Sequence, residues 1–229
     1  MVSIKVWDNV SDKFDTYKKD VWYGAADNIY TVWPVFLKYI KKHYKHPKNL
    51  KALDFGCGTG MFCRELLSLK FNPVGIDVSP KMIKIAKKHL GKKVKYLVGD
   101  SKTALKLAKK EGKFNLITSI MVLQFIKNIK PALKQLAGSL EKGGHIIFVN
   151  HNPKNLSERK ARLKFNVAQT GNIVKIYSKS AQEYSKILKP LGFVKTMEKY
   201  LHSPDFIKKH HIEKTKSPKY MLLAFKKAL

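Results

Sequence analysis

The segment Leu53-Asp-Phe-Gly-Cys-Gly-Thr-Gly60 constrains the fold of this chain more than any other feature. It follows an apolar run and precedes an amphipathic segment, which is the order of strand, loop and helix. Alternate glycines let the backbone turn tightly and approach a ligand closely, while the start of the next helix offers amide hydrogens and a positive dipole end. The segment therefore predicts a nucleotide site at the carboxyl end of a parallel strand.

The rest of the chain continues this alternation of apolar runs and amphipathic segments. Strands are predicted at residues 50–55, 73–76, 94–98, 114–119 and 145–149, with helices between them at 61–70, 80–90, 102–110 and 131–141. We expect Gly143-Gly144 to close the last of these helices. A helix at 29–44 precedes this core, and a helix at 178–191 and strands at 193–200 and 220–225 follow it. Such a pattern predicts an α/β fold with a Rossmann-like, doubly wound sheet.

The loop sequence also restricts which nucleotide it can hold. A dinucleotide fingerprint would need glycine where Met61 stands, and a phosphate-binding loop would need Gly-Lys-Ser/Thr, which is absent. Asp54 would repel a pyrophosphate, but it suits a ligand that carries an ammonium group. The loop therefore favours a nucleoside without phosphate groups.

Three residues beyond the loop fit such a ligand. Asp77 ends the second predicted strand, where its carboxylate can accept both ribose hydroxyls. Asp100 ends the third strand and is placed to accept the adenine amino group, while Met82 can pack on the adenine face. Each of the two carboxylates, taken alone, is equally consistent with a helix N-cap. Their order at successive strand ends, together with the glycine loop, favours the ligand site.

Taken together, these motifs resemble those of class I S-adenosylmethionine-dependent methyltransferases. The resemblance rests on the glycine loop, Gly75-Ile-Asp-Val-Ser-Pro-Lys-Met82, Gly99-Asp100, Phe114–Ser119 with Val122-Leu-Gln-Phe125, and Leu140-Glu-Lys-Gly-Gly144. It is closest to the small-molecule group that includes ubiquinone- and menaquinone-biosynthesis-like enzymes (methyltransferase type 11). It implies a seven-stranded sheet, mostly parallel with an antiparallel last strand, and helices on both faces.

The resemblance also implies roles for the matching positions. Asp54 and the loop Gly56–Gly60 would hold the methionine moiety of S-adenosylmethionine, Asp77 the ribose, and Asp100 with Ser101 the adenine. The full set of expected cofactor residues is Asp54, Gly56, Cys57, Gly58, Gly60, Asp77, Val78, Met82, Asp100, Ser101, Ser119 and Ile120. Within this set, Ser119 and Ile120 would border the methionine moiety. The product formed from the cofactor would be S-adenosylhomocysteine.

Methyl transfer from a sulfonium needs a base only when the acceptor carries a proton that must leave. His151 follows the fifth predicted strand and is the first candidate, with a surface-loop histidine as the alternative interpretation. Gln124 stands where the family often has His, which removes a titratable group, and Asn115 replaces a usual Asp at the start of a strand. We expect Gln124 and Asn150 to contact the acceptor. The sequence shows no metal-ligand spacing, so no metal is expected.

An aromatic segment precedes the first predicted strand and is the candidate lid over cofactor and acceptor. Tyr17 is expected to position the acceptor, and Trp22 and Tyr23 to contact it. Tyr30 and Trp33 are also explained by an amphipathic helix packing on the sheet. The expected organisation is a single methyltransferase domain, 1–229, with a lid at 1–48, a cofactor-binding core at 49–152, an insertion at 153–177, and a C-terminal helix and last strands at 178–229.

The net charge of +30 is unevenly distributed. Residues 1–35 carry a net charge of −1, whereas 36–149 carry +18 and 150–229 carry +13. Such a field attracts anions, nucleic acid and acidic membrane surfaces. Nucleic acid is not favoured, because the basic residues are 43 Lys and only 3 Arg, and Arg is the preferred side chain for bidentate recognition. We expect Asp54, Asp77 and Asp100 to be turned inward, which would make the surface still more basic.

The sequence therefore predicts an enzyme that transfers a methyl group from S-adenosylmethionine to O, N or C of a small acceptor, for which the charge favours an anion. The alternatives are an RNA or protein methyltransferase that uses the basic surface, and a cofactor-binding module without turnover. The chain has no secretory signal, lipidation motif or apolar run long enough to span a bilayer, so a cytoplasmic protein is expected. Its two cysteines, Cys57 and Cys63, do not make a disulfide framework.

Overall fold

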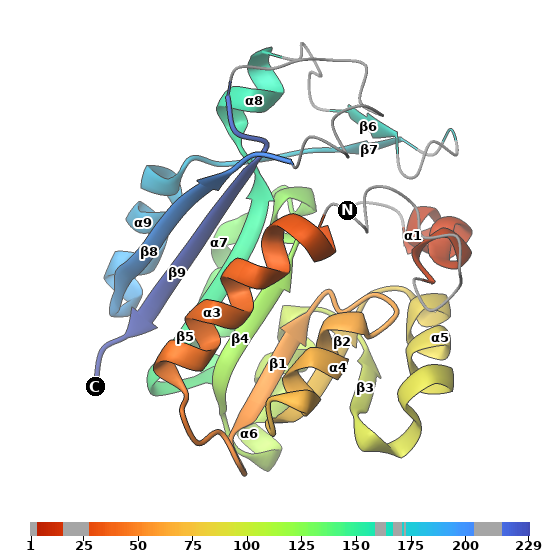
Figure 1. The fold of residues 1–229 in the computed structure, drawn as a ribbon, viewed down its shortest axis with the longest axis vertical. Coiled ribbons are helices and arrows are strands. Elements are labelled where there is room, and N and C mark those ends of the chain that lie inside the picture. Colours follow the sequence, from red (N-terminus) through yellow and green to blue (C-terminus); the bar gives the residue numbers. More distant parts are fainter. Residues whose placement is uncertain (1–3, 16–27, 159–163, 167–170, 172, 204–216) are drawn as a thin grey trace.

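The computed structural model describes residues 4–15, 28–158, 164–166, 171, 173–203 and 217–229. Its centre is a seven-stranded sheet (Figure 1) with the strand order β3-β2-β1-β4-β5-β9-β8. These strands are β1 (Lys51–Phe55), β2 (Asn72–Asp77), β3 (Lys95–Val98), β4 (Phe114–Ile120), β5 (Leu140–His151), β8 (Phe193–Leu201) and β9 (Tyr220–Lys227). A separate two-stranded sheet pairs β6 (Lys164–Asn166) with β7 (Ile173–Lys175).

The helical elements alternate with these strands. The α-helices are α1 (Ile4–Val10), α3 (Trp33–His43), α4 (Met61–Ser68), α5 (Pro80–Leu90), α6 (Ser101–Glu111), α7 (Ile129–Ser139), α8 (Pro153–Glu158) and α9 (Ala181–Leu188). Short 3₁₀ turns are η1 (Ser11–Phe14), η3 (Gly91–Lys93), η4 (Leu123–Phe125) and η6 (Lys189–Leu191), and η2 (Asn28–Val32) is a π-helical turn. None of the helices in the described ranges is long and apolar enough to cross a membrane.

The strand order confirms the predicted fold class. Strands β1 to β5 pair in parallel, and β9 is antiparallel to both β5 and β8. The chain builds outward from β1 to β3 and then returns to β4 on the other side of β1. The order of strands thus reverses between β1 and β4. In open α/β sheets, ligands bind at the carboxyl ends of the strands near such a reversal.

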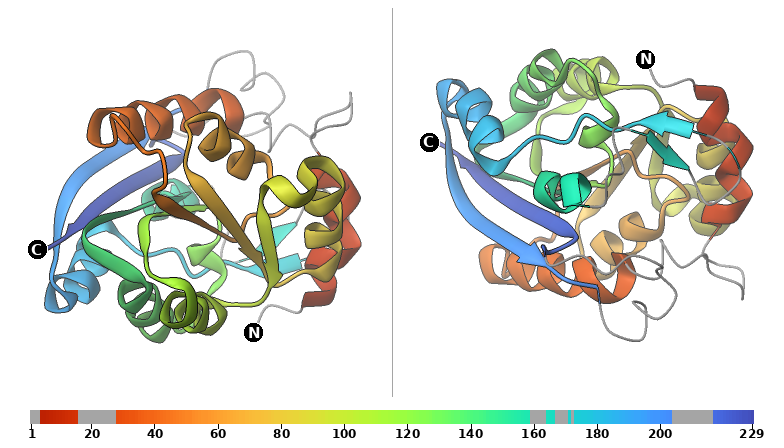
Figure 2. Two further views of the ribbon diagram at one scale, coloured as in Figure 1. Left: turned by 90° about the horizontal axis from the view of Figure 1, so that it is seen from below. Right: turned by 90° about the horizontal axis from the view of Figure 1, so that it is seen from above.

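Helices cover both faces of the sheet (Figure 2). On one face α6, α7 and α9 bury residues such as Leu133 and Tyr184 against the strands. On the other face α3 and α4 bury Phe36 and Phe62. Helix α5 adds a smaller cluster around Ile83 on the side of α4. Both faces of the central strands are therefore apolar, as a doubly wound sheet requires.

The helix starts follow from local sequence. Ser79 caps α5 by accepting a hydrogen bond from the Met82 amide at 3.1 Å, and Pro80 occupies the first turn, where no amide donor is needed. Helix α9 begins with a capping box between Ser180 and Glu183. The helix predicted at 80–90 is confirmed with the same bounds. Its start could be predicted because Ser79 and Pro80, which both mark a helix start, are adjacent in the sequence.

Two of the predicted helices differ from the structure in detail, and one predicted segment contains additional elements. The helix predicted at 29–44 is present as a continuous helical segment over 28–43, whose first turn is the π-helical turn η2 and whose remainder is α3. Helix α7 ends at Ser139, and Gly143-Gly144 lies inside β5, since Leu140 already pairs with Phe114 of β4. The region predicted as an insertion without period contains α8, β6 and β7.

Candidate functional site

The glycine loop after β1 is tied to the end of β2 by backbone hydrogen bonds. The amides of Gly56 and Cys57 both donate to the Ile76 carbonyl, at 2.7 and 3.1 Å. The Gly58 amide donates to Asp77 Oδ2 at 2.9 Å. These bonds hold the loop at the carboxyl edge of the sheet, beside the reversal of strand order.

Glycine is required in this loop for two different reasons. Gly58 has φ +52°, and a Cβ atom placed there would meet no described atom within 4 Å, so its backbone faces open space. A Cβ at Gly56 would instead collide with Val122, which follows β4. The loop is therefore packed closely against the β4 connection at Gly56 and open to a ligand at Gly58.

Asp77 connects the glycine loop to the loop that follows β2. Its Oδ2 accepts from the Gly58 amide and its Oδ1 accepts from the Ser79 amide, each at 2.9 Å. Burial raises the pKa of this carboxyl, and the hydrogen bonds from Ser79 and Gly58 oppose that rise. The Val78 backbone also hydrogen-bonds to Asp77, and since a carboxylate offers about four acceptor positions, Asp77 retains capacity for a hydroxyl donor.

Asp54 lies under the glycine loop and is almost fully buried, with 2% of its surface exposed. Its Oδ1 accepts from the Thr118 hydroxyl at 3.0 Å, and its Oδ2 accepts from the Cys63 thiol at 3.6 Å. Burial raises the pKa of Asp54 to about 7, against the lowering effect of these hydrogen bonds. A buried carboxylate of this kind gains stability from a cationic ligand.

Asp100 differs from the other two carboxylates because its side chain is exposed. It caps α6, with Oδ1 accepting from the amides of Lys102 and Thr103 at 2.8 and 3.4 Å. The expectation that all three carboxylates turn inward is therefore wrong for Asp100. Its neighbour Ser101 is buried and donates to Gln135 Oε1 at 2.6 Å.

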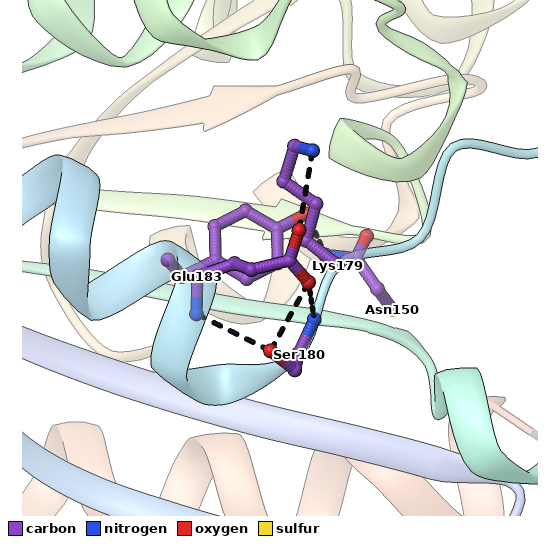
Figure 3. A network of polar contacts seen from close by, with 5 residues as sticks. Asn150, Lys179, Ser180 and Glu183 are labelled. Atoms are coloured by element: carbon purple, nitrogen blue, oxygen red, sulfur yellow. Dashed lines mark hydrogen bonds and ion pairs between the residues drawn. The ribbon is translucent and has the colours of Figure 1, made fainter.

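The carboxyl ends of β4 and β5 carry a buried polar cluster. His151 and Gln124 are 4% and 0% exposed, so the interpretation of His151 as a surface-loop histidine is wrong. Gln124 Oε1 accepts from the His151 backbone amide at 2.7 Å. Asn150 Nδ2 donates to the Tyr184 hydroxyl at 3.0 Å. Figure 3 shows Asn150 beside the capped start of α9.

Comparison with known proteins identifies the family to which these loops belong. A family model described as a methyltransferase domain matches residues 31–197, which is most of the chain. The chain belongs to this family. Its fold and family together make it a class I S-adenosylmethionine-dependent methyltransferase, as the motifs predicted.

Curated relatives and solved structures agree with this assignment. The chain is 26% identical over 200 residues to a ubiquinone biosynthesis O-methyltransferase of Pelagibacter ubique, covering 82% of this chain and 81% of that protein. A second ubiquinone biosynthesis O-methyltransferase, from Xanthomonas axonopodis, is 24% identical over 78% of this chain and 74% of its own length. An S-adenosylmethionine-dependent methyltransferase structure from Mesorhizobium loti shares the fold, with TM-score 0.67, 18% identity, and coverage of 90% of this chain and 100% of that one.

The N-terminal segment of the methyltransferase packs over the β2 loop. Asp8 Oδ1 accepts from the Ser79 hydroxyl at 2.5 Å and from the Lys81 amide at 3.2 Å. The Thr59 hydroxyl of the glycine loop donates to the Phe14 carbonyl at 2.9 Å. Residues from α1 and η1 thus contact two of the loops that carry expected cofactor residues.

Apolar side chains complete this cover. Met82 is buried in a cluster with Val10 and Val174, and the ring centroids of Trp7 and Phe125 lie 5.0 Å apart in an edge-on contact. The expected lid residues Tyr17, Trp22 and Tyr23 lie outside the described residues. Sequence reasoning missed the contribution of Val174, because a three-residue strand in a region without periodicity gives no signal.

The remaining predicted residues lie at the strand ends. Ser119 is buried and donates from its hydroxyl to the Phe55 carbonyl at 3.0 Å, and Ile120 is half-buried at the end of β4. Val78 follows Asp77 and is half-buried. Within the described ranges, no group of three or more His, Cys, Asp or Glu side chains is placed to hold a metal ion.

Proposed function

We propose that the chain transfers the methyl group of S-adenosylmethionine to an oxygen atom of a small acceptor. The observation that carries this proposal is the position of Asp77, whose carboxylate joins the glycine loop to the β2 loop and retains acceptor capacity for a ribose. The oxygen acceptor is supported by the curated relatives, which are named as O-methyltransferases.

The residues at the carboxyl edge fit the chemistry of this cofactor. The open backbone at Gly58 permits close approach, Asp77 suits the ribose hydroxyls, and buried Asp54 suits the cationic methionine end. Asp100 caps α6 through Oδ1, which leaves Oδ2 to accept the adenine amino group. We assign the adenine environment to Val78, Met82, Asp100 and Ser101, and the methionine border to Cys57, Gly60, Ser119 and Ile120.

The cofactor supplies an activated methyl group and a neutral leaving group when bound. The protein must align the acceptor oxygen with that methyl and exclude water. We assign the acceptor to the carboxyl ends of β4 and β5, bounded by Gln124, Asn150 and His151. The cover built by Trp7, Phe125 and their neighbours supports exclusion of water from this region.

Cofactor binding tests the first part of the proposal. Isothermal calorimetry with S-adenosylmethionine is expected to show about 10- to 100-fold weaker binding for Asp77→Ala, because charge-assisted hydrogen bonding to the ribose is lost. Gly58→Arg is expected to abolish binding by filling the open space. Gly91→Arg is the matched control, since Gly91 also has positive φ and open surroundings but lies at the amino end of β3. Unchanged binding in both site variants would refute the assignment.

Transfer of labelled methyl groups into a fractionated cell extract tests the acceptor. Label in small organic compounds supports the proposal when it resists alkali, as a methyl ether does. Label in RNA or protein would instead favour the alternative that the net charge of +30 suggests. Cofactor binding without any label in the extract would indicate a binding module.

A further inference from the structure

Gln124 occupies a position from which it can control the proton on His151. It lies in η4, between the glycine loop and the end of β5. A Cβ at Gly56 would collide with Val122, two residues before Gln124, while the Gln124 side chain itself reaches His151. The segment that carries Gln124 thus touches, through Val122, the loop that we assign to the methionine end of the cofactor.

The orientation of the Gln124 amide is fixed by the backbone. A backbone amide can only donate, so the atom that lies 2.7 Å from the His151 nitrogen must be the Gln124 oxygen. The same oxygen lies 3.2 Å from His151 Nδ1. Because an oxygen without a hydrogen can only accept, Nδ1 carries the proton in the neutral ring. The lone pair of the imidazole is then on Nε2.

Both partners are held rigidly by their main chains. The backbone amide of Gln124 donates to Asn150 Oδ1 at 3.2 Å, and the backbone carbonyl of Gln124 accepts from the Tyr177 amide at 2.6 Å. The Ser178 hydroxyl donates to the His151 carbonyl at 2.6 Å. These bonds connect η4, β5 and the segment before α9. The ring of His151 also stacks on Tyr220 of β9, with centroids 6.0 Å apart.

Gln124 has a structural role, since its oxygen satisfies the buried backbone amide of His151, but the same oxygen also contacts the His151 ring. The Nε2 of Gln124 is buried and has no hydrogen-bond partner among the described residues. A buried donor left without a partner destabilises a fold, so the unpaired Nε2 is an energetic cost of keeping the amide oxygen beside His151. The amide oxygen, in contrast, makes two contacts to one residue, His151.

We propose that Gln124 is a positioning residue that holds His151 with Nε2 as the proton acceptor for a hydroxyl-bearing acceptor. This inference rests on the proposed methyl transfer and deepens it. The acceptor O–H bond breaks and its proton goes to Nε2. The oxygen electron pair forms the new C–O bond, the C–S bond breaks, and its electron pair stays on the neutral thioether. His151 is left as imidazolium and returns its proton to water.

The tautomer of His151 tests the inference directly. In protein labelled with ¹⁵N-histidine, NMR correlation through the ring is expected to show the Nδ1–H form for the signal that disappears in His151→Asn. Gln124→Leu is expected to lose this preference, while Gln124→Glu retains it because a carboxylate oxygen also accepts from Nδ1. Gln182→Leu, the same change on the exposed side of α9, is the control and should leave the signal unchanged.

Kinetics supply a second readout, in which the pH profile of Gln124→Glu is the quantity that a structural role would not move. With the extract fraction that the wild type labels, Gln124→Leu is expected to lower the maximal rate about 10- to 100-fold without weakening cofactor binding. Gln124→Glu should move the acidic limb of the pH profile upward by about one unit, because a neighbouring carboxylate stabilises the imidazolium.

The two levels of the proposal fail in different ways. If the wild type labels no acceptor, the proposed function fails. An Nε2–H tautomer in the wild type overturns the inference regardless of turnover. A changed tautomer in Gln124→Leu with an unaltered rate and pH profile also overturns it, because His151 would then not take the proton.

Discussion

Strand β5 carries two buried histidines with different surroundings: His145 lies level with the amino ends of β1 and β4, and His151 is the last residue of the strand. His145 and His151 project from the same face of the sheet, since they are six residues apart on a regularly paired strand. At the amino end, Tyr44 donates its hydroxyl proton to the Asn115 carbonyl at 2.7 Å, so its oxygen accepts from His145 Nδ1 at 2.9 Å. At the carboxyl end, Gln124 takes the corresponding place beside His151.

The comparison shows that a defined tautomer does not by itself make a base. Both histidines carry the proton on Nδ1, and the Nε2 of His145 has no partner in the described part of the chain. His145 nevertheless lies among Tyr39, Tyr44 and His43, at the end of the sheet opposite the glycine loop. The location at the carboxyl edge, beside the assigned cofactor loop, distinguishes His151.

The largest expected effect separates the two histidines by activity. His151→Asn is expected to lower the rate of methyl transfer by about 10²- to 10⁴-fold, because asparagine cannot take a proton. His145→Asn, assayed on folded protein, should change the rate by less than about threefold. Initial rates with labelled cofactor measure both. Equal losses in the two variants would remove the distinction between the two ends of the sheet.

The second effect is on stability and depends on pH. Burial, His43 and Lys226 lower the pKa of His145 from 6.5 to about 4. The unfolded chain therefore binds a proton more readily, and stability falls as the pH drops from about 6.5 towards 4. The full difference corresponds to about 3 kcal/mol.

Urea unfolding across this pH range measures the effect of His145. In His145→Gln, which does not titrate, the loss of unfolding free energy on acidification should be smaller than in the wild type. Carboxyl groups titrate in both proteins, so only the difference between them is informative. The same dependence in wild type and variant would contradict the lowered pKa of His145.

The contrast between the two ends also shows what the sequence can predict. The glycine loop, Asp77 and the cap at Ser79 were predictable because their signals lie within short stretches of chain. The contacts Gln124–His151, Asp8–Ser79 and Tyr44–His145 join residues 27, 71 and 101 positions apart. No local pattern contains such contacts. Gln124 was therefore interpreted as a lost titratable group, whereas its oxygen orients a neighbouring one.

A third effect tests the structural role of the amino end. Tyr44→Phe removes the hydroxyl that serves both Asn115 and His145, and leaves two buried polar groups without it. We expect a loss of about 1–3 kcal/mol in the free energy of unfolding. Tyr200→Phe is the matched control, because Tyr200 is 44% exposed and its hydroxyl donates to the surface residue Glu198. Its expected cost is below about 0.5 kcal/mol.

The smallest effect concerns Asp54 and links pH to cofactor binding at the carboxyl end. Burial raises the pKa of Asp54 to about 7, so below this pH the cationic cofactor must displace a proton before it gains the charge of the carboxylate. Affinity should therefore fall about tenfold for each pH unit below about 7.

Calorimetry of S-adenosylmethionine binding in two buffers of different ionisation enthalpy would measure both the affinity and the proton released. Asp54→Asn should bind more weakly at neutral pH and lose the proton release, whereas His145→Gln should retain both, because His145 lies at the other end of the sheet. Proton release that persists in Asp54→Asn would assign it to another group and separate Asp54 from the cofactor.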